Sequence, residues 1–426
     1  MRVLIAGSGA REHALAWVCR RDHPNVELFC APGNGGTQAI ATNLPVAADD
    51  PTAIVAAARD VDASLVVIGP DAALAAGVAD ACTAAGIPVF GPSAAAARIE
   101  SSKSFAKQLM DGAGIPTARW RGGGAADRAA LWAFVDELDG RCVIKADGLA
   151  LGKGVTVCDD REQARAAISA CLDERRFGMA GHHVLVEERL SGPEISVLAL
   201  TDSLRIRVLP VSRDYKRIGE GNTGPNTGGM GAITPPPGVD GALLDAVERD
   251  VLRPCIDALA AAGAPFSGCL YAGLMLTPDG PRVIEFNARL GDPETQVVLP
   301  VVDEDVLELL VQCATGTLAA GRAGQATPSC ATGVVLAASG YPGPPRRGDV
   351  ITGLDTLDAG VLAFHAGTRR DPDGTLRTDG GRVITLVARG DSLEAAGRRV
   401  YSALPGVGFE GMRHRGDIGA QQVGDG

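Results

Sequence analysis

Short apolar runs alternate with alanine-rich stretches through the first hundred residues, and this rhythm restricts the possible folds more than any other feature of the chain. We predict helices at 13–20, near 51–60 and at 72–85. Between them lie four buried strands, each followed by a turn of small residues: Arg2–Ala6, Val26–Cys30, Ser64–Ile68 and Ile87–Phe90. Strands that alternate with helices are typical of a parallel α/β sheet. Ligands bind at the carboxyl ends of such strands, so we expect a binding site there.

Beyond residue 92 the pattern changes. A helix is predicted at 93–112, followed by a Gly/Ala-rich link near 120. A compact α+β unit comes next, with a helix at 161–172 and strands at 141–146, 154–158 and 183–188. Longer strands follow at 194–200, 204–211, 268–276 and 282–288, with helices at 240–262 and 303–315. After a linker at 321–329, a β-rich unit is expected from strands at 332–338, 361–365 and 382–388.

These elements predict an α/β chain of three domains. The first is an open parallel α/β domain over 1–101. The second covers 102–295 and includes a small mobile α+β subdomain at 121–190. The third is a β-rich domain at 328–420.

Composition argues against several classes of function. The net charge of -11 has the wrong sign for a nucleic-acid partner. No window approaches the roughly 18 uncharged apolar residues of a membrane span, and the N-terminal apolar run is too short for a signal peptide. We therefore expect a cytoplasmic protein with no membrane partner. Ten cysteines form no C-x-x-C pair and six histidines are scattered, so neither a disulfide framework nor a zinc site is expected.

The five lysines are unevenly placed among the 40 basic residues. All lie between residues 103 and 216: Lys103, Lys107, Lys145, Lys153 and Lys216. A bias toward arginine leaves lysine where a compact ammonium is needed. Lys107 follows Lys103 by one helical turn and is interpreted as an exposed exception. The other lysines suggest one polyanion site in the middle of the chain.

Two glycine-rich turns resemble nucleotide-binding motifs but differ from them in detail. In GSGAREH at 7–13, Glu12 stands where a dinucleotide motif has its third glycine. The turn can still hold another phosphate on its N–H groups, with Arg11 and Glu12 at its mouth, or be a tight turn only. KADGLALGKGV at 145–155 lacks the spacing of a Walker A loop. Lying between two strands, it is either a flap that closes over a triphosphate or an ordinary hairpin loop.

Acidic residues mark two strands of the central region. In VIEFNARLGDPETQ at 283–296, strand alternation places Glu285, Asn287 and Arg289 on one face, opposite the apolar face of Ile284, Phe286 and Ala288. Hard oxygen ligands with open positions suit Mg²⁺ that carries phosphates, whereas the alternative is a ladder of salt bridges. In LVEERLSGPEISV at 185–197, the acids at 187, 188 and 194 flank a strand-to-strand crossover that could hold a nucleoside.

The stretch DYKRIGEGNTGPNTGGMGA at 214–232 is too rich in glycine to bury itself, yet it carries Lys216. Together with GSGAREHA, KADGLALGKGV, EFNARLGDPETQ and the closing DIG at 417–419, it resembles the ATP-grasp ligases. More narrowly, the chain resembles the glycinamide ribonucleotide synthetase family over nearly its whole length. The resemblance implies an ATP-grasp core in the central domain, and it implies that 214–232 is a substrate loop.

The resemblance also implies a reaction and a set of site residues. The reaction joins glycine to 5-phosphoribosylamine with ATP and Mg²⁺, with Mn²⁺ as the alternative metal, in a monomeric enzyme of purine synthesis. Catalytic roles fall on Asp214, Lys216 and Arg289, and the metal ligands are Glu285 and Asn287. ATP is assigned to Lys103, Lys145, Gly152, Glu187, Glu188, Leu190 and Glu194. The substrates are assigned to Gly9, Arg11, Glu12, Asn34, Asp71 and Gly291.

Two other classes of enzyme are alternatives. An ATP-grasp ligase with another acceptor, such as a biotin carboxylase relative, would lack D-Y-K-R and N-T-G-G-M-G together. A nicotinamide oxidoreductase is suggested only by the glycine turn at 7–9.

Overall fold

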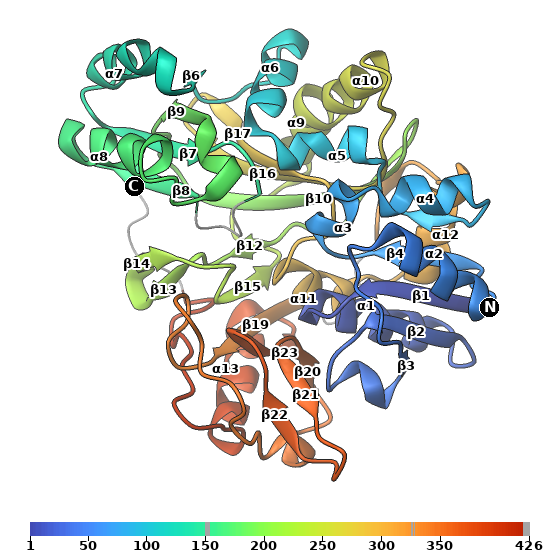
Figure 1. Cartoon of the computed structure of the whole chain (residues 1–426). Coiled ribbons are helices and arrows are strands. Elements are labelled where there is room, and N and C mark those ends of the chain that lie inside the picture. The colour runs from blue at the N-terminus through green and yellow to red at the C-terminus, as the bar shows by residue number, and fades with distance from the viewer. Residues whose placement is uncertain (150–153, 325–326, 328, 421–426) are drawn as a thin grey trace.

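The N-terminal residues form an open parallel sheet, as the alternating pattern predicts (Figure 1). The structure, a computed structural model, describes residues 1–149, 154–324, 327 and 329–420. The strands are β1 (Arg2–Gly7), β2 (Glu27–Pro32), β3 (Thr42–Asn43), β4 (Leu65–Ile68) and β5 (Val89–Phe90). They lie in the order β3-β2-β1-β4-β5, and every pairing is parallel.

Helices cover this sheet, and two of the predicted ones are interrupted. Their bounds are α1 (Ala10–Asp22), α2 (Pro51–Asp60), α3 (Asp71–Ala75), α4 (Val78–Ala84) and α5 (Ala94–Ser101). The helix predicted at 72–85 breaks at Gly77, whose φ of 84° is left-handed. The helix predicted at 93–112 breaks at Ser102, whose extended backbone and side chain cap the next helix, α6 (Lys103–Ala113).

The central sheet packs against the N-terminal unit. Its strands are β10 (Glu194–Asp202), β11 (Ile206–Val208), β16 (Ser267–Thr277), β17 (Gly280–Asn287) and β18 (Gly321–Arg322), in the order β17-β16-β10-β11-β18. The accompanying helices are α9 (Gly241–Val247), α10 (Arg253–Ala261), α11 (Glu294–Val298) and α12 (Val306–Thr315), with one π turn at 248–252 between α9 and α10. One apolar cluster runs from Leu4 and Val66 to Val197 and Leu270, so the two units share a core. The linker predicted at 321–329 was wrong at its start, because β18 pairs with β11.

The small α+β unit contains one strand and one helix more than the sequence indicated. Its sheet has the order β6-β9-β7-β8, formed by β6 (Trp120–Gly123), β7 (Cys142–Ala146), β8 (Val155–Cys158) and β9 (Val184–Glu188). Two helices, α7 (Arg128–Glu137) and α8 (Arg161–Leu172), cover it. The predicted link near 120 was wrong, because main-chain pairing with β9 makes a strand of its glycines. Leu131, Phe134 and Val135 give α7 a buried face at helical spacing.

The glycine-rich stretch at 214–232 joins the C-terminal sheet at both of its ends and forms a hairpin between them. Its strands are β12 (Arg213–Asp214), β13 (Arg217–Gly219), β14 (Thr223–Asn226) and β15 (Gly231–Thr234). The C-terminal elements are β19 (Cys330–Ala337), β20 (Val361–His365), β21 (Thr368–Arg370), β22 (Leu376–Thr378), β23 (Arg382–Gly390) and α13 (Leu393–Ala403). The sheet order β12-β15-β19-β23-β20 inserts β15 beside β19, while β13 and β14 form a separate hairpin. The α/β fold class is confirmed, with antiparallel sheets following the parallel one.

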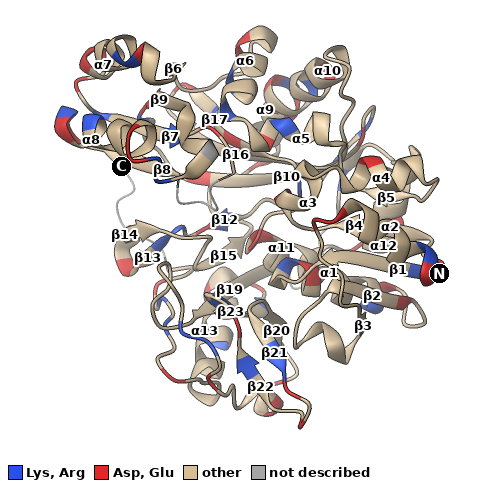
Figure 2. Ribbon diagram, in the orientation of Figure 1, with Lys and Arg blue, Asp and Glu red and all other residues tan. Residues whose placement is uncertain are grey.

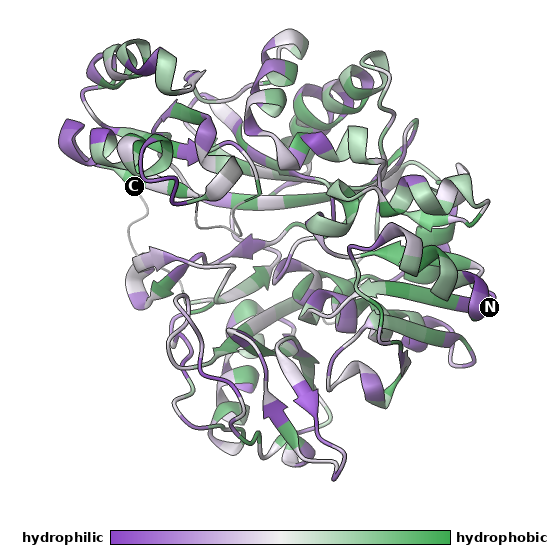
Figure 3. Ribbon diagram, in the orientation of Figure 1, coloured by the Kyte–Doolittle hydropathy of each residue, from purple (hydrophilic) through white to green (hydrophobic). Residues whose placement is uncertain are grey.

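Polarity follows this architecture. Apolar residues dominate the strands β1 and β2 in Figure 3. Figure 2 shows charged residues on outer helices such as α7, α8 and α10, and further charged residues near β12 and at α11. All ten cysteines are free and nine are buried, as predicted. Among the described residues, no helix has both the length and the hydropathy that a bilayer crossing requires.

Candidate active site

Lys216 lies two residues after β12, and its ammonium is surrounded by carboxylates from three strands, β10, β12 and β17. Nζ is 3.2 Å from Glu194 Oε2, 3.4 Å from Glu285 Oε1 and 3.9 Å from Asp214 Oδ1. Burial opposes the charge of Lys216, but the three carboxylates outweigh burial and raise its pKa well above the ordinary value. Lys216 is therefore a fixed positive charge at neutral pH.

Glu285 is the point on which the candidate cations converge. Attraction to Lys216 is the largest cause that lowers the pKa of Glu285 to about 2, against the effect of burial. Lys145, Lys103 and Arg289 lower it further. The side chain is 36% exposed, so the carboxylate is both ionised and open to a ligand. Residues far apart in the sequence thus form one charged centre.

Asp214 differs from Glu285 in its environment. Burial is the largest cause that raises the pKa of Asp214, and the attraction of Lys216 offsets only part of this effect. The carboxylates of Glu194, Glu285 and Glu294 raise this pKa further. Asp214 therefore holds a proton more readily than an ordinary aspartate does.

A β-bulge changes the predicted alternation along β17. The pairing of β16 with β17 shifts between Gly273 and Leu274, which leaves Ile284 as the extra residue. Val283 occupies the buried position that strict alternation gives to Ile284, so that part of the prediction was wrong. The carbonyl of Ile284 instead accepts a hydrogen bond of 2.8 Å from Lys145 Nζ. The bulge thereby ties Lys145 to the strand that carries Glu285.

Lys107 is buried, which corrects the prediction of an exposed side chain. It is 2% exposed, and its Nζ lies 2.9 Å from Glu187 Oε2 and donates to Thr117 Oγ1 at 2.8 Å. Glu187 Oε1 lies 3.0 Å from Lys145 Nζ, so one buried carboxylate bridges two lysines. Burial opposes the charge of Glu187, but Lys145 and Lys107 lower its pKa. Glu187 is therefore almost completely buried between these two lysines, and the sequence did not indicate this structural role.

The other nucleotide candidates lie along one side of this group. Lys103 begins α6 and donates to the carbonyl of Gly148 at 2.9 Å. Glu188 ends β9, with its carboxylate 3.3 Å from Arg119 Nε, and Leu190 lies half-buried between β9 and β10. Gly152 lies outside the described residues, as does Lys153.

Arg289 connects the central site to the N-terminal unit. Its Nη2 is 2.8 Å from Glu100 Oε1 and 3.4 Å from Asn287 Oδ1. Glu100 also accepts the N–H of Ala288 at 2.8 Å. Burial opposes the charge of Arg289, but Glu100 and Asp71 outweigh it and raise the pKa of Arg289. The sequence did not single out Glu100, whose position in a predicted helix gave no functional signal.

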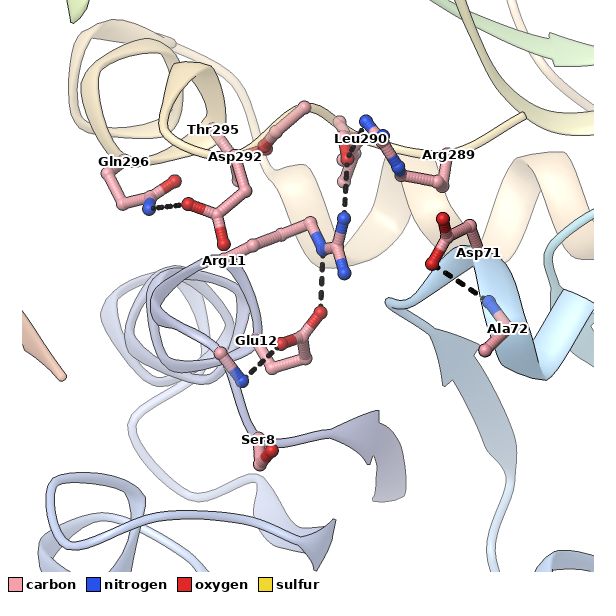
Figure 4. Close-up of polar contacts among 12 residues, drawn as sticks. Ser8, Arg11, Glu12, Asp71, Ala72, Arg289, Leu290, Asp292, Thr295 and Gln296 are labelled. Carbon is pink, nitrogen blue, oxygen red and sulfur yellow. Dashed lines mark hydrogen bonds and ion pairs between the residues drawn. The ribbon is translucent and has the colours of Figure 1, made fainter. Parts of the chain in front are cut away.

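The start of α1 forms the N-terminal part of the site (Figure 4). The N–H of Gly9 donates to Glu12 Oε2 at 2.5 Å, Arg11 Nε donates to Glu12 Oε1 at 2.6 Å, and Arg11 Nη1 donates to the carbonyl of Leu290 at 3.1 Å. Glu12 also fills the space beside Gly69, where a Cβ would lie 1.9 Å from Oε1. A dinucleotide would place its phosphates on these same N–H groups, so the geometry disfavours a nicotinamide cofactor.

The remaining N-terminal candidates shape the site in different ways. Asn34 Nδ2 donates to the carbonyls of Ser8 at 2.9 Å and His365 at 2.8 Å, which joins the N-terminal and C-terminal units. Asp71 begins α3 and lies toward Arg289 in Figure 4. Gly291 leaves room for a neighbouring acid, since a Cβ there would be 2.5 Å from the Oε2 of residue 294.

Three polar residues that the sequence did not single out lie behind Lys216. Ser196 Oγ is 2.8 Å from Tyr271 Oη and 3.2 Å from Glu294 Oε1. Tyr271 and Glu294 are 2% and 3% exposed. Ser196 and Glu294 lie in segments that the sequence marked for other residues, and Tyr271 lies in an apolar strand, so only the three-dimensional contacts reveal them.

The donors that could hold a divalent cation are few. No group of three or more His, Cys, Asp or Glu side chains in the described part of the chain forms a ready metal site. Glu285 and Asn287 supply one ionised carboxylate and one amide oxygen at the end of β17. Such a pair fits Mg²⁺, which keeps open positions for phosphate oxygens and water.

Three family models together match most of the chain. They are the N domain of phosphoribosylglycinamide synthetase at residues 1–100, its ATP-grasp (A) domain at 101–295 and its C domain at 331–421. A phosphoribosylamine--glycine ligase from Streptomyces coelicolor is 48% identical over 430 aligned residues, covering 100% of both chains. The chain belongs to the phosphoribosylglycinamide synthetase family. The predicted resemblance to ATP-grasp ligases is therefore confirmed.

Other members of the phosphoribosylglycinamide synthetase family show how far the similarity extends. The trifunctional purine biosynthetic protein adenosine-3 of Gallus gallus is 42% identical over 99% of this chain and 42% of its own length. The crystal structure of phosphoribosylamine--glycine ligase from Thermotoga maritima matches with a TM-score of 0.86 at 33% identity, over 98% of this chain and 100% of that chain.

A protein outside the family shares the fold alone. It is a biotin carboxylase from Campylobacter jejuni, which matches with a TM-score of 0.73 at 18% identity, over 97% of this chain and 92% of that chain.

Proposed function

We propose that the chain joins glycine to 5-phosphoribosylamine at the expense of ATP, giving glycinamide ribonucleotide, ADP and phosphate. One observation carries this proposal: Lys216 Nζ lies 3.4 Å from Glu285, Lys145 donates to the carbonyl of the residue before Glu285, and Lys103 and Arg289 lower the pKa of Glu285 further. A cluster of cations around one metal-binding carboxylate suits a triphosphate with its divalent cation. The names of the full-length relatives indicate that glycine and phosphoribosylamine are the two substrates that ATP joins.

The reaction proceeds in two steps. A carboxylate oxygen of glycine attacks the γ-phosphorus of ATP, the bond between that phosphorus and the β,γ-bridging oxygen breaks, and ADP leaves. The amine of phosphoribosylamine then attacks the carbonyl carbon of glycyl phosphate. The carbon–oxygen bond breaks, phosphate leaves, and the new amide nitrogen loses a proton. No enzyme nucleophile is required, so the protein contributes position and charge.

The central residues divide these tasks. Lys103 and Lys145 bind phosphate oxygens of ATP, and Glu187 holds Lys145 in place from a buried position. Glu188, Leu190 and Glu194 line the path from β9 to β10, where the nucleoside binds. Glu285 and Asn287 would hold Mg²⁺, which draws electron density from the phosphates when it is bound. Lys216 and Asp214 contact glycine and the phosphoryl group that is transferred. Arg289 stabilises the negative charge of that leaving γ-phosphoryl group.

The N-terminal residues receive phosphoribosylamine. Arg11 and Asp71 offer opposite charges to its phosphate and hydroxyl groups, and Gly9 allows close approach of the main chain. Glu12 orients Arg11 through their 2.6 Å contact. Beside this region, Asn34 joins the N-terminal unit to the C-terminal unit, and Gly291 leaves room for the carboxylate of residue 294. We further propose that the enzyme acts as a monomer with Mg²⁺ as its metal.

The test is an ADP-release assay with each substrate omitted in turn. Release that requires both glycine and phosphoribosylamine, with glycinamide ribonucleotide identified by mass, supports the proposal. Release that proceeds with bicarbonate in place of glycine would favour a carboxylase-type acceptor instead. Light scattering of the purified 43.5 kDa chain tests the monomer directly.

A further inference from the structure

The closing segment Arg415–Gly419 has no part in the proposed chemistry, yet it contains the largest fully buried side chain of the described residues. Arg415 is 0% exposed. Its Nε and Nη2 bind Asp417 Oδ1 and Oδ2 at 2.7 and 2.6 Å, a two-point contact in which the guanidinium matches the carboxylate. Burial opposes the charge of Asp417, but the hydrogen bonds from Arg415 and Gly221 outweigh it and lower its pKa.

This ion pair grips the β13–β14 hairpin of the glycine-rich stretch. Arg415 Nη1 donates to the carbonyl of Arg217 and to Asn222 Oδ1, both at 3.1 Å. Asp417 Oδ2 accepts the N–H of Gly221 at 2.9 Å. Asn222 has a left-handed φ of 53°, which few residues other than glycine adopt. The closing segment therefore holds a turn that has little apolar surface of its own.

The same segment also fixes the residue before Lys216. The guanidinium of Arg415 stacks 5.1 Å from the ring centre of Tyr215, and the N–H of Gly419 donates to Tyr215 Oη at 3.1 Å. Tyr215 and Arg217 flank Lys216, and neighbouring side chains of an extended segment point to opposite faces. Holding the Tyr215 side chain on one side leaves the Lys216 ammonium directed to the other side, among Glu194, Asp214 and Glu285.

A second pair of contacts holds the far end of the stretch. Tyr341 Oη accepts the N–H of Gly228 at 2.8 Å. Arg382 Nη1 donates to the carbonyls of Gly228 and Asp292, the latter at 3.0 Å. Both residues belong to the C-terminal unit at 331–421, and no candidate catalytic group lies between those residue numbers. The stretch is thus anchored by that unit at both of its ends.

We propose that Arg415 and Asp417 are positioning residues, forming a clasp by which the C-terminal unit sets Lys216 for its work on glycine and the phosphoryl group. This inference rests on the proposed function for the identity of the substrate. The contacts predict that opening the clasp loosens residues 217–226 and misplaces Lys216, while the sites of Lys103 and Lys145 keep their ATP contacts.

The test uses Asp417→Asn in the full chain, with Glu410→Gln as the matched control. Glu410 forms a two-point contact with Arg346 in the same unit but does not contact the stretch. The readouts are hydrogen exchange of residues 217–226, kcat/KM for glycine, the Kd of ATP measured with a fluorescent analogue, and a thermal melt. A misplacement near 1 Å predicts about a 10- to 100-fold loss in kcat/KM for glycine.

Faster exchange at 217–226 and a selective loss for glycine, with the Kd of ATP within about twofold of wild type and the control unchanged, support the clasp. Unchanged exchange, or equal losses for glycine and ATP, would overturn it. If Asp417→Asn does not fold, Tyr215→Phe removes only the hydroxyl that receives the N–H of Gly419 and is judged by the same readouts. A wild-type chain that fails to use glycine refutes the proposed function, whereas the exchange measurement still decides the clasp.

Discussion

Replacing Glu285 by glutamine tests the centre of the site, because Glu285→Gln keeps the shape of the side chain and removes its charge. The carboxylate holds a pKa of about 2 through Lys216 and other cations. Relative to its ordinary value of 4.5, this corresponds to roughly 3 kcal/mol of attraction. Because the side chain is 36% exposed, solvent screening reduces that figure to about 1–2 kcal/mol.

The effect on activity is expected to exceed the effect on folding. Lys216 keeps Glu194 and Asp214 in the variant, so the thermal melt shifts little. The metal loses its only charged candidate ligand, and a change of several kcal/mol in transition-state stabilisation lowers the rate by roughly 10²-fold or more. The assay is kcat/KM against Mg²⁺ concentration. Asp279→Asn, which neutralises an exposed acid on the turn of the same β16–β17 hairpin, is the control. A variant that melts normally and keeps near-native activity at limiting Mg²⁺ would refute the metal assignment.

Three further outcomes are expected. Arg11→Ala raises KM for phosphoribosylamine about tenfold or more while the Kd of ATP stays within about twofold; equal losses for both would contradict the division between the sites. Lys107→Met leaves Glu187 with one lysine, lowers the free energy of unfolding by about 1–3 kcal/mol in urea titrations and raises KM for ATP; an unchanged KM would mean that Lys107 does not act through Glu187. Burial lowers the pKa of His13 to about 3 and of His365 to about 4, below the ordinary 6.5. The unfolded chain then binds more protons between about pH 6.5 and pH 4, so the free energy of unfolding falls as pH drops through that window. Urea titrations at pH 7, 5.5 and 4.5 measure this fall, and His13→Gln should reduce it; a fall of equal size in the variant would exclude His13 as its source.

Local patterns predicted the fold wherever one stretch determines its own structure. The strands β1, β2, β4 and β5 of the parallel sheet and helix α8 follow from apolar periodicity and turn residues, whereas β3 was not predicted. Long-range pairing was less accessible. Nothing in the residues at 120–123 signals that they join β9, and nothing near 231 signals pairing with β19. Such pairings are decided by main-chain hydrogen bonds across many residues, which side-chain patterns do not record.

The site shows the same limit at the level of single residues. Scarcity of lysine drew attention to Lys103, Lys145 and Lys216, which all lower the pKa of Glu285. The scarcity of lysine did not show that Lys107 is buried, because the burial of Lys107 depends on its ion pair with the buried Glu187. Glu100 is equally hidden in the sequence, since its partner Arg289 lies just after strand β17, in another unit. The sequence indicated the lysines and acids of the candidate site, but it did not indicate which of these side chains contact one another.

The central claim is that the carboxylate of glycine attacks the γ-phosphorus of ATP before the amide forms. Glycine labelled with ¹⁸O in both carboxylate oxygens tests this directly, with the products analysed by mass spectrometry. Glycyl phosphate formation predicts that each released phosphate carries one ¹⁸O atom and that each glycinamide ribonucleotide keeps one. Phosphate that contains no ¹⁸O while the amide still forms would contradict the proposed chemistry.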